Sequence, residues 1–240
     1  MPEEVGIILD NLKFVKSTKF GDIELFSGEM TINKSKKILV TTAWSGWGKV
    51  SAARATTRLL SAKIKNIPVD FVLFTGVAGA IDKNLKQWDI VIAESVIQHD
   101  MDARPLFEKY VIPAIKSKKI YSNPEILDKV FSLLNEKLLN NKLKKFGNVS
   151  KGLIATGDQF VSERSKIYKL FKDIDGLLAV EMEGAAFAQV ACQENFDWFV
   201  MRVISDGADE NADDEFSEFI QKYKLQSFEL IKLFLESLLS

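Results

Sequence analysis

Histidine and cysteine are nearly missing from this sequence. Its 240 residues include one histidine, His99, and one cysteine, Cys192. A single cysteine cannot form an intrachain disulfide, which is typical of proteins of the reducing cytoplasm. Zinc sites need several cysteine or histidine ligands, and Ser–His or Cys–His nucleophiles need a nearby histidine. We therefore expect no metal and no cofactor, and any catalysis should depend on carboxylates, hydroxyls and backbone groups.

The sequence also lacks an excess of either charge and any long apolar run. It has 32 basic and 33 acidic residues, whereas a general nucleic-acid-binding protein has a basic excess. No apolar run approaches the roughly 18 residues that span a bilayer. The first residues include acids where a signal peptide has bases. The composition is therefore typical of a soluble globular protein with no nucleic-acid or membrane partner.

Apolar periodicity predicts strands that alternate with helices. Helices are predicted at 5–12, 50–63, 123–139, from 183 onward, and at 228–239. Strands are predicted at 22–26, 29–32, 37–44, 71–75, 90–96, 152–156, 177–180 and 199–204, with turns at 27–28 and 76–79 and a long loop at 98–119. This order is typical of an α/β fold with a mostly parallel or mixed sheet, and we expect residues 1–240 to form a single domain.

The stretch 177–209 holds the strongest candidate site. One apolar strand is followed by Glu181 and Glu183, and the next strand contains Arg202 and ends near Asp206. Ligands of α/β sheets bind at the carboxyl ends of strands. A buried guanidinium must be paired, so Arg202 is expected to contact one of the glutamates. A purely structural interpretation remains, because acids are common at helix starts and in turns, and an ion pair can simply stabilise a sheet.

Three other motifs give weaker signals. Residues 45–49, Ser-Gly-Trp-Gly-Lys, lack the first glycine and the terminal Ser/Thr of a phosphate loop, so we interpret them as a tight turn whose amides can approach a small ligand. Phe160 follows a strand and could stack on a ligand or belong to the core. His99-Asp100 could be an acid–base pair, although a lone histidine is more often structural.

Taken together, the motifs resemble the methylthioadenosine/S-adenosylhomocysteine nucleosidases of the wider nucleoside phosphorylase family. The matching motifs, in order over nearly the whole chain, are Ser45-Gly46-x-Gly48-Lys49-Val50, Thr75-Gly76-x-Ala78-Gly79, His99-Asp100-x-Asp102, Gly157-Asp158-x-Phe160, Ala179-Val180-Glu181-Met182-Glu183 and Arg202-x-Ile204-Ser205-Asp206. The Val-Glu-Met-Glu and Ile-Ser-Asp pair is the specific part. The resemblance implies a three-layer α/β/α fold with a mixed central sheet, a homodimer, and hydrolysis of the N-glycosidic bond of 5′-substituted adenosines.

The resemblance also implies a role for each matching residue. Asp206 would bind adenine and donate a proton toward its N7, while Phe160 would stack on the base and the backbone of Val161 would bond it. Glu183 would hold the ribose hydroxyls, with Arg202 supporting its carboxylate. The other implied substrate-site residues are Met182 against the sugar, Ala78 and Gly79 on the ribose side, Glu181, Ser205, Phe216 as a cover, and a 101–107 loop beside the partner subunit's 5′ substituent.

The sequence departs from the family pattern in two places. The family's catalytic base is the glutamate of an N-terminal Gly-Ala-Met-x-x-Glu segment; the start of this chain matches the end of that segment and gives Glu4 the role of activating water. The family's first strand, which precedes this methionine, has no counterpart in the sequence given. Val77 stands where the nucleosidases usually carry a serine, so we expect slower turnover.

Several functions on the same fold stay open at this point. A phosphorolytic purine nucleoside phosphorylase needs arginines for phosphate, and the phosphorylases place one where this chain has Phe74, so hydrolysis is favoured. Hydrolases of AMP or futalosine are further candidates; AMP would need a cationic 5′ pocket, for which Arg104 is one candidate. An adenine-binding or adhesion protein with little catalysis is a different class, which binding without turnover would identify.

Overall fold

The computed structural model describes residues 2–34, 36–61, 69–140, 143–207 and 212–239, with the backbone alone for 2–5, 164 and 212–217. Its strands are β1 (Leu12–Phe20), β2 (Ile23–Thr31), β3 (Lys37–Thr42), β4 (Phe71–Ala80), β5 (Ile90–Gln98), β6 (Lys119–Tyr121), β7 (Val149–Thr156), β8 (Leu177–Glu181) and β9 (Asp197–Asp206). Its helices are α1 (Pro2–Asp10), α2 (Lys49–Leu60), α3 (Pro124–Leu139), α4 (Arg164–Asp173), α5 (Gly184–Gln193), α6 (Ala212–Tyr223) and α7 (Ser227–Leu238). The fold is mixed α/β, as the sequence predicts.

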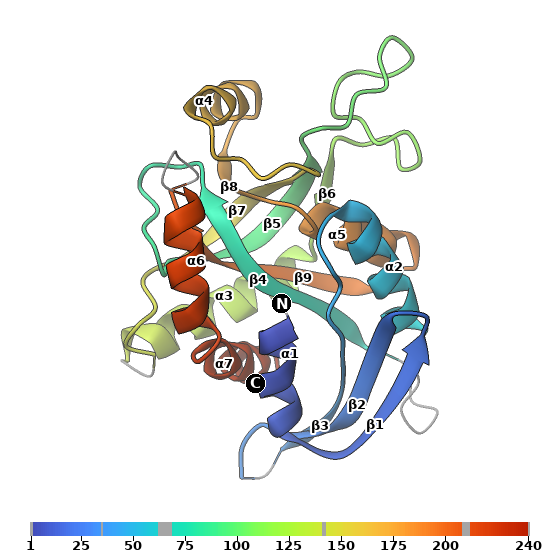
Figure 1. Ribbon diagram of the computed structural model, residues 1–240, viewed down its shortest axis with the longest axis vertical. Coiled ribbons are helices and arrows are strands. Elements are labelled where there is room, and N and C mark those ends of the chain that lie inside the picture. Colours follow the sequence, from blue (N-terminus) through green and yellow to red (C-terminus); the bar gives the residue numbers. More distant parts are fainter. Residues whose placement is uncertain (1, 35, 62–68, 141–142, 208–211, 240) are drawn as a thin grey trace.

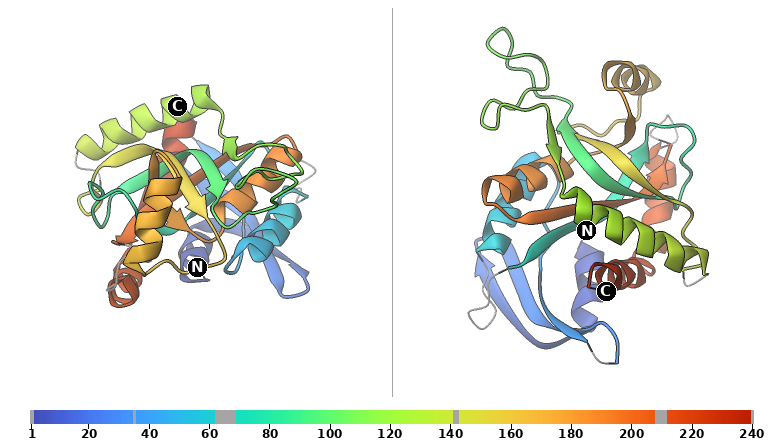
Figure 2. Two further views of the ribbon diagram at one scale, coloured as in Figure 1. Left: turned by 90° about the horizontal axis from the view of Figure 1, so that it is seen from above. Right: turned by 180° about the vertical axis from the view of Figure 1, so that it is seen from behind.

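Six strands form the central sheet, in the order β6-β5-β7-β8-β4-β9. The pairs β5–β7, β7–β8 and β4–β9 are parallel, whereas β5–β6, β4–β8 and β5–β9 are antiparallel. The sheet is therefore mixed, and the β5–β9 pair closes five strands into a ring, which the sequence did not predict. Helices α3 and α7 lie on one side of it and α2 and α5 on the other (Figures 1 and 2).

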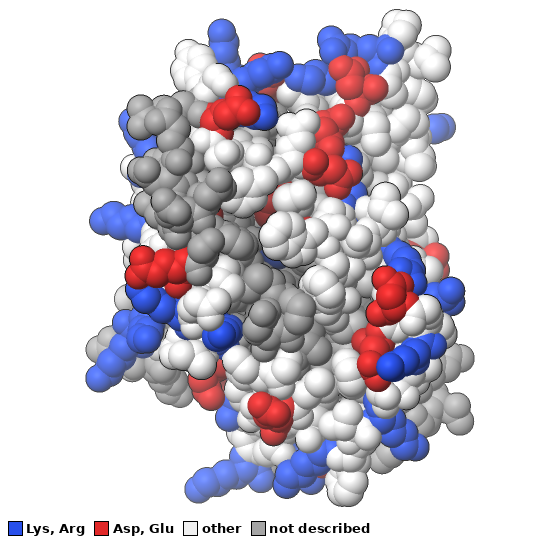
Figure 3. Space-filling view, viewed as in Figure 1, with Lys and Arg blue, Asp and Glu red and all other residues white. Residues whose placement is uncertain are grey.

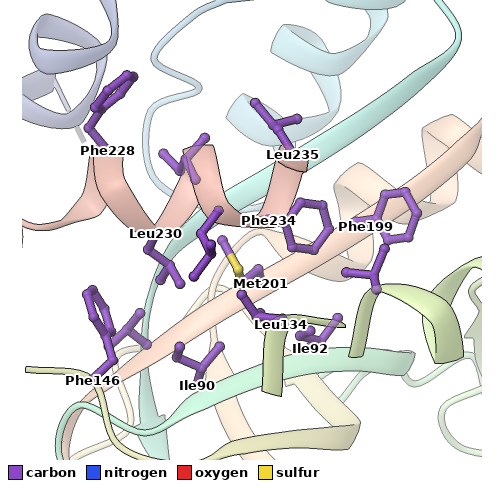
Figure 4. Close-up of a cluster of buried hydrophobic side chains, with 14 of the residues drawn as sticks. Ile90, Ile92, Leu134, Phe146, Phe199, Met201, Phe228, Leu230, Phe234 and Leu235 are labelled. Carbon is purple, nitrogen blue, oxygen red and sulfur yellow. The ribbon is translucent and has the colours of Figure 1, made fainter. Parts of the chain in front are cut away.

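Strand β9 shows why a continuous apolar run lies at the centre of the fold. Successive side chains of a strand point to opposite faces of the sheet. Phe199 and Met201 pack in the cluster that includes α3 and α7, whereas Val200 and Ile204 pack in the cluster that includes α5. Figure 4 shows the first cluster, where side chains of α7 meet those of β9. Because both faces are covered, any charged residue of β9 must find a partner inside the protein.

The first three strands form a separate antiparallel sheet, in the order β1-β2-β3. The predicted turn at 27–28 is wrong, because β2 is continuous there and the turn lies at Gly21, where φ is +67°. Gly28 is instead a place of close approach: a Cβ on it would lie 3.1 Å from the Cβ of Leu12. The sequence did not predict β1, because Leu12 is its only buried residue and apolar alternation is therefore lacking.

Strand β4 also differs from the prediction. It does not turn at the glycine-rich residues 76–79 but continues through them to Ala80, paired with β9 as far as Gly79. Gly76 makes room for a neighbour, since a Cβ on it would overlap the guanidinium of Arg202. Small residues in this strand therefore indicate close packing beside the sheet rather than a change of chain direction.

A largely apolar cavity of about 410 Å³ lies between β3 and β4 and is lined by residues 38–45 and 69–75 of the two segments. Within the described residues, β3 pairs only with β2, and β4 pairs with β9 and, at its end, with β8. In this part of the chain, one edge of β3 and, as far as Ala78, one edge of β4 therefore lack a ladder partner.

The helices agree with the sequence where apolar periodicity is strong. The side chain of Asn123 accepts hydrogen bonds from the amides of Glu125 and Ile126, so the predicted start of α3 is confirmed. Helix α4 was not predicted: Leu170 is its only buried side chain among those described, and Phe171 is exposed. In the ranges that the structure covers, no helix is long and apolar enough to cross a membrane.

Helix α3 offers a direct test of the core. Leu134 is fully buried between α3 and the sheet, whereas Leu139 at the end of the same helix is 75% exposed. Leu134→Ala should lower the free energy of unfolding by about 2–5 kcal/mol, because it removes buried methyl groups and leaves a cavity. Leu139→Ala should change it by less than about 0.5 kcal/mol. Urea unfolding of both variants measures the difference, and equal losses would contradict this core.

Candidate functional site

The ends of three strands meet around a cavity of about 120 Å³. Gly79 of β4 pairs with Asp206 of β9 on one side and with Val180 of β8 on the other. This register brings the acid that ends β9 to the same edge of the sheet as the acids that follow Val180. The predicted residues that line the cavity are Ala78, Gly79, Phe160, Val161, Glu181, Met182, Glu183, Arg202, Ser205 and Asp206.

Glu181 is a buried carboxylate surrounded by donors. It accepts hydrogen bonds from the guanidinium of Arg202, from the hydroxyl of Thr156, and from the amides of Glu183 at 3.1 Å and Gly184 at 2.8 Å. Both amides belong to the start of α5, where the helix dipole favours a negative charge. Glu181 therefore lies at a helix start and also forms an ion pair with Arg202.

Arg202 reaches its partners by crossing a neighbouring strand. It lies on β9 beside Gly76 of β4, and β8 is the next strand beyond. Its Nη2 contacts Glu181 and lies 3.4 Å from Oε2 of Glu183, while its guanidinium lies over the ring of Phe74, 4.7 Å from the centroid. The expected pairing of this arginine is confirmed, with both glutamates, and the cation–π contact adds to it.

Glu183 is the glutamate that a ligand can reach. Its side chain is 15% exposed, compared with 2% for Glu181, and its Oε1 accepts the amide of Gly48 at 2.9 Å. Burial raises the pKa of Glu183, and the charge of Glu181 raises it further, while Arg202 and the Gly48 amide act in the opposite direction. The net shift is upward. An amide of the 45–49 turn thus bonds to a protein carboxylate, and the approach of this turn to a small ligand stays a prediction.

Asp206 and Phe160 lie at other walls of the cavity. Asp206 is buried at the end of β9, where the hydroxyl of Ser205 donates to its Oδ2. Gln87 fixes this strand end by donating to the backbone oxygen of Ser205 at 2.7 Å. Phe160 is 41% exposed, and an aromatic ring in such a position is typical of contacts with flat ligands. A buried acid and an aromatic ring thus share one small cavity.

Two neighbours of the site were not predicted. Thr156 is fully buried, and its hydroxyl donates to Glu181 and accepts the amide of Ala185 at 2.7 Å. Trp47 lines the cavity from the 45–49 turn. The sequence signal for Thr156 was its position at the end of an apolar strand, directly before Gly157. Trp47 gave no signal beyond its place in the 45–49 turn.

Other predicted residues lie elsewhere. The side chains of Glu4 and Phe216 lie outside the described part of the chain. Arg104 pairs with Asp102 and does not line the described cavity. The carboxylate of Asp100 contacts Lys49, so an acid–base pair of His99 with Asp100 is not what the structure shows. Burial lowers the pKa of His99, which keeps its ring neutral at pH 7.

The electrostatic surroundings fit a small, uncharged ligand. Figure 3 shows basic and acidic side chains interspersed on one face of the molecule, without a large patch of one sign. Among the described residues, no group of three or more His, Cys, Asp or Glu could hold a metal ion. The cavity is lined by the carboxylates of Glu183 and Asp206 and by the aromatic ring of Phe160, a set of groups that suits a sugar joined to a flat base.

Comparison with known families agrees with this geometry. The family model described as "Phosphorylase superfamily" matches residues 1–236. The chain belongs to the phosphorylase superfamily.

Within the superfamily, the chain is similar to nucleosidases. It is 32% identical over 238 residues to the 5′-methylthioadenosine/S-adenosylhomocysteine nucleosidase of Staphylococcus epidermidis. The matched region covers 99% of this chain and 97% of the relative. The S-adenosylhomocysteine nucleosidase of Streptococcus pyogenes, solved with 5-methylthiotubericidin, is 30% identical with a TM-score of 0.84, over 98% of this chain and 93% of that one. The futalosine hydrolase of Helicobacter pylori is also 30% identical, with a TM-score of 0.82, over 98% and 94% of the two chains.

The buried pair at the centre of the site predicts a large effect of a small change. Glu181→Gln removes the charge that balances Arg202 and replaces one acceptor oxygen by a donor. The variant should lose about 3–5 kcal/mol of unfolding free energy, because the guanidinium stays buried and keeps only the more distant carboxylate of Glu183. Glu218→Gln, on an exposed ion pair of α6, is the control and should leave stability unchanged. Chemical denaturation compares the two; a stable Glu181→Gln protein would contradict this assignment.

Proposed function

We propose that this protein hydrolyses the N-glycosidic bond of 5′-substituted adenosines, such as 5′-methylthioadenosine and S-adenosylhomocysteine, and releases adenine. The observation that carries the proposal is a single cavity lined both by the buried Asp206 and by Glu183, which Arg202 contacts. The nucleosidase relatives, matched over nearly the whole chain at about 30% identity, support the same reaction.

The base would bind at Asp206. Departure of adenine needs a proton on the ring, and a buried carboxylic acid at the sheet edge can hold or share that proton with N7. Phe160 would stack on the base, and the backbone of Val161 would hydrogen-bond its edge. A structure of the Colwellia psychrerythraea nucleosidase, 30% identical with a TM-score of 0.83, contains adenine, which supports a base-binding cavity in this fold.

The sugar would bind at Glu183. A carboxylate accepts two hydroxyl groups well, and Arg202 and the Gly48 amide keep it oriented. Met182 and Gly79, which also line the cavity, would pack against the ribose. Loss of the base leaves an oxocarbenium-like centre, as in glycoside hydrolysis, where carboxylates divide the acid and base work. Glu4 would activate the attacking water, a role that rests on the resemblance alone.

Water rather than phosphate is the nucleophile that this cavity favours. Phosphate is a dianion and is usually held by arginine or lysine. Among the described residues that line the cavity, Arg202 is the only cation, and it is already bonded to Glu181 and Glu183. Phe74 occupies the position at which the phosphorylases are expected to carry an arginine. These observations support hydrolysis over phosphorolysis.

Two finer proposals follow from the resemblance. A homodimer would place residues 101–107 of each subunit over the 5′ substituent bound by the other, and the 85% exposure of Leu106 in this loop supports a covering partner. The cytoplasm is the proposed location, which the single cysteine supports.

Asp206→Asn tests the reaction directly. The variant keeps the shape of the side chain but cannot donate a proton from a carboxylic acid, so adenine release from methylthioadenosine should fall by about 10²–10⁴-fold. Chromatography with and without phosphate measures it, and wild-type release should not depend on phosphate. 5-Methylthioribose 1-phosphate as co-product would move the protein to the phosphorylases. Tight adenine binding without wild-type turnover would instead support a binding protein.

The raised pKa of Glu183 predicts an acid limb in substrate binding. As the pH falls toward that pKa, the carboxylate gains a proton and loses an acceptor for the ribose hydroxyls. The Michaelis constant should therefore begin to rise at a pH above the ordinary carboxyl value of 4.5. Glu183→Gln, which has no proton to gain, should bind weakly at every pH and lack this limb. A wild-type KM that is flat down to pH 4.5 would contradict the assignment.

A further inference from the structure

A group of charged side chains beside the cavity has no part in the proposed reaction. Lys49, the first residue of α2, directs its ammonium group to oxygens of three side chains, which lie at the end of β5, in the turn after it and in the 157–161 loop. Its Nζ lies 2.7 Å from Oδ1 of Asp100, 3.4 Å from Oε1 of Gln98 and 3.9 Å from Oδ2 of Asp158. We call these four residues the Lys49 network.

Backbone hydrogen bonds strengthen the network. Oδ1 of Asp158 accepts the amide of Lys49 at 2.8 Å, and Oδ2 of Asp100 accepts the amide of Asp158 at 3.0 Å. No side chain near Gly48, the residue that precedes α2, caps that helix, so Asp158 supplies the cap from a distant loop. The network thus joins three segments: the 45–49 turn, the end of β5 and the 157–161 loop.

Two of these segments carry a group that lines the cavity or bonds to a residue that lines it. The amide of Gly48, next to Lys49, donates to Glu183 on the sugar side. Phe160, two residues after Asp158, lines the cavity on the base side. The network therefore connects a sugar-binding and a base-binding group without lining the cavity itself.

The 45–49 turn needs such support because of the strand before it. In the described part of the chain, β3 pairs only with β2, so no ladder connects the turn to the central sheet. The side chains of Lys49 and Asp100 are only 18% and 22% exposed, which limits solvent screening of their attraction. Burial raises the pKa of Asp100, but the Lys49 and Asp158 hydrogen bonds lower it more, so the carboxylate stays ionised at neutral pH.

We propose that Lys49 and Asp100 are positioning residues that set the distance between the Gly48 amide and Phe160 across the cavity, and thereby the affinity for the nucleoside. The inference rests on the proposed function and adds two residues to its binding machinery. The proton donor, Asp206, lies on β9, to which the network makes no bond. Loss of the network should therefore weaken binding more than it slows the chemical step.

The test compares kinetics and amide exchange in matched variants. Lys49→Met and Asp100→Asn each remove the ion pair, and Lys49→Arg keeps the charge. Lys137→Met is the control, because Lys137 forms a similarly buried ion pair with Glu236 between α3 and α7, away from the cavity. Steady-state adenine release gives KM and kcat, and hydrogen exchange by mass spectrometry reports on the 45–50 and 157–163 segments.

Lys49→Met and Asp100→Asn should raise KM about tenfold, change kcat by less than about threefold, and speed hydrogen exchange in both segments. Lys49→Arg keeps the charge, so its KM and exchange should lie between those of Lys49→Met and wild type. Lys137→Met should leave KM and both segments as in wild type. An unchanged KM in folded Lys49→Met and Asp100→Asn would overturn the proposal. So would variants that lose thermal stability but keep the KM and the exchange rates of wild type.

The same experiment separates this proposal from the proposed function. Absence of wild-type turnover would remove the nucleosidase assignment. The positioning role of the Lys49 network would then be tested by two measurements. One is hydrogen exchange in the two segments, and the other is the change in the adenine dissociation constant between wild type and Lys49→Met. An unchanged constant, or exchange as slow as in wild type, would overturn it.

Discussion

A guanidinium buried in the middle of the sheet is the constraint on which the site depends. Arg202 lies on β9, whose two faces are both covered, so its charge must be balanced inside the protein. Glu181 provides that balance from β8, and Gly76 on the intervening strand leaves the space for the side chain to cross. The cost of desolvating the carboxylate is offset by Thr156 and the amides of α5. The ends of three strands are thereby held together where a ligand would bind.

The same constraint gives identical functional groups different properties. Glu181 accepts bonds from several donors and its side chain is only 2% exposed, so its charge balances Arg202 inside the protein. Glu183, two residues later, shares the arginine but reaches the cavity, and burial beside another carboxylate raises its pKa. Asp206 lies on the other side of Gly79, bonded to a neighbouring hydroxyl rather than to the arginine. Position relative to Arg202 therefore decides which carboxylate is structural and which can meet a sugar or a base.

Much of the site could be predicted because its residues interrupt apolar strands. Arg202 and Glu181 stand out where burial on both faces leaves no other reason for a charge, and the Val-Glu-Met-Glu motif adds specificity. Strand β1 could not be predicted, since its face is almost entirely exposed, nor could the ring closed by β5 and β9, which is a long-range pairing without a local signal. Thr156 was missed for a related reason: a threonine ending a strand is common, and only the buried carboxylate beside it makes it important.

In the part of the chain that the structure describes, one edge of β3 and most of one edge of β4 lack a ladder partner, which explains why polar contacts matter so much here. Trp44, Ser45, Phe74 and Thr75 line both the larger cavity between these strands and the smaller one at the site, so the two cavities adjoin. A wall of the site is therefore not continuous with the hydrogen-bonded sheet. Directional bonds, from Gly48 to Glu183 and from Lys49 to Asp100, hold that wall instead. A site built in this way depends on a few charged contacts for its geometry, whereas the core around α7 and β9 depends on apolar packing that many residues share.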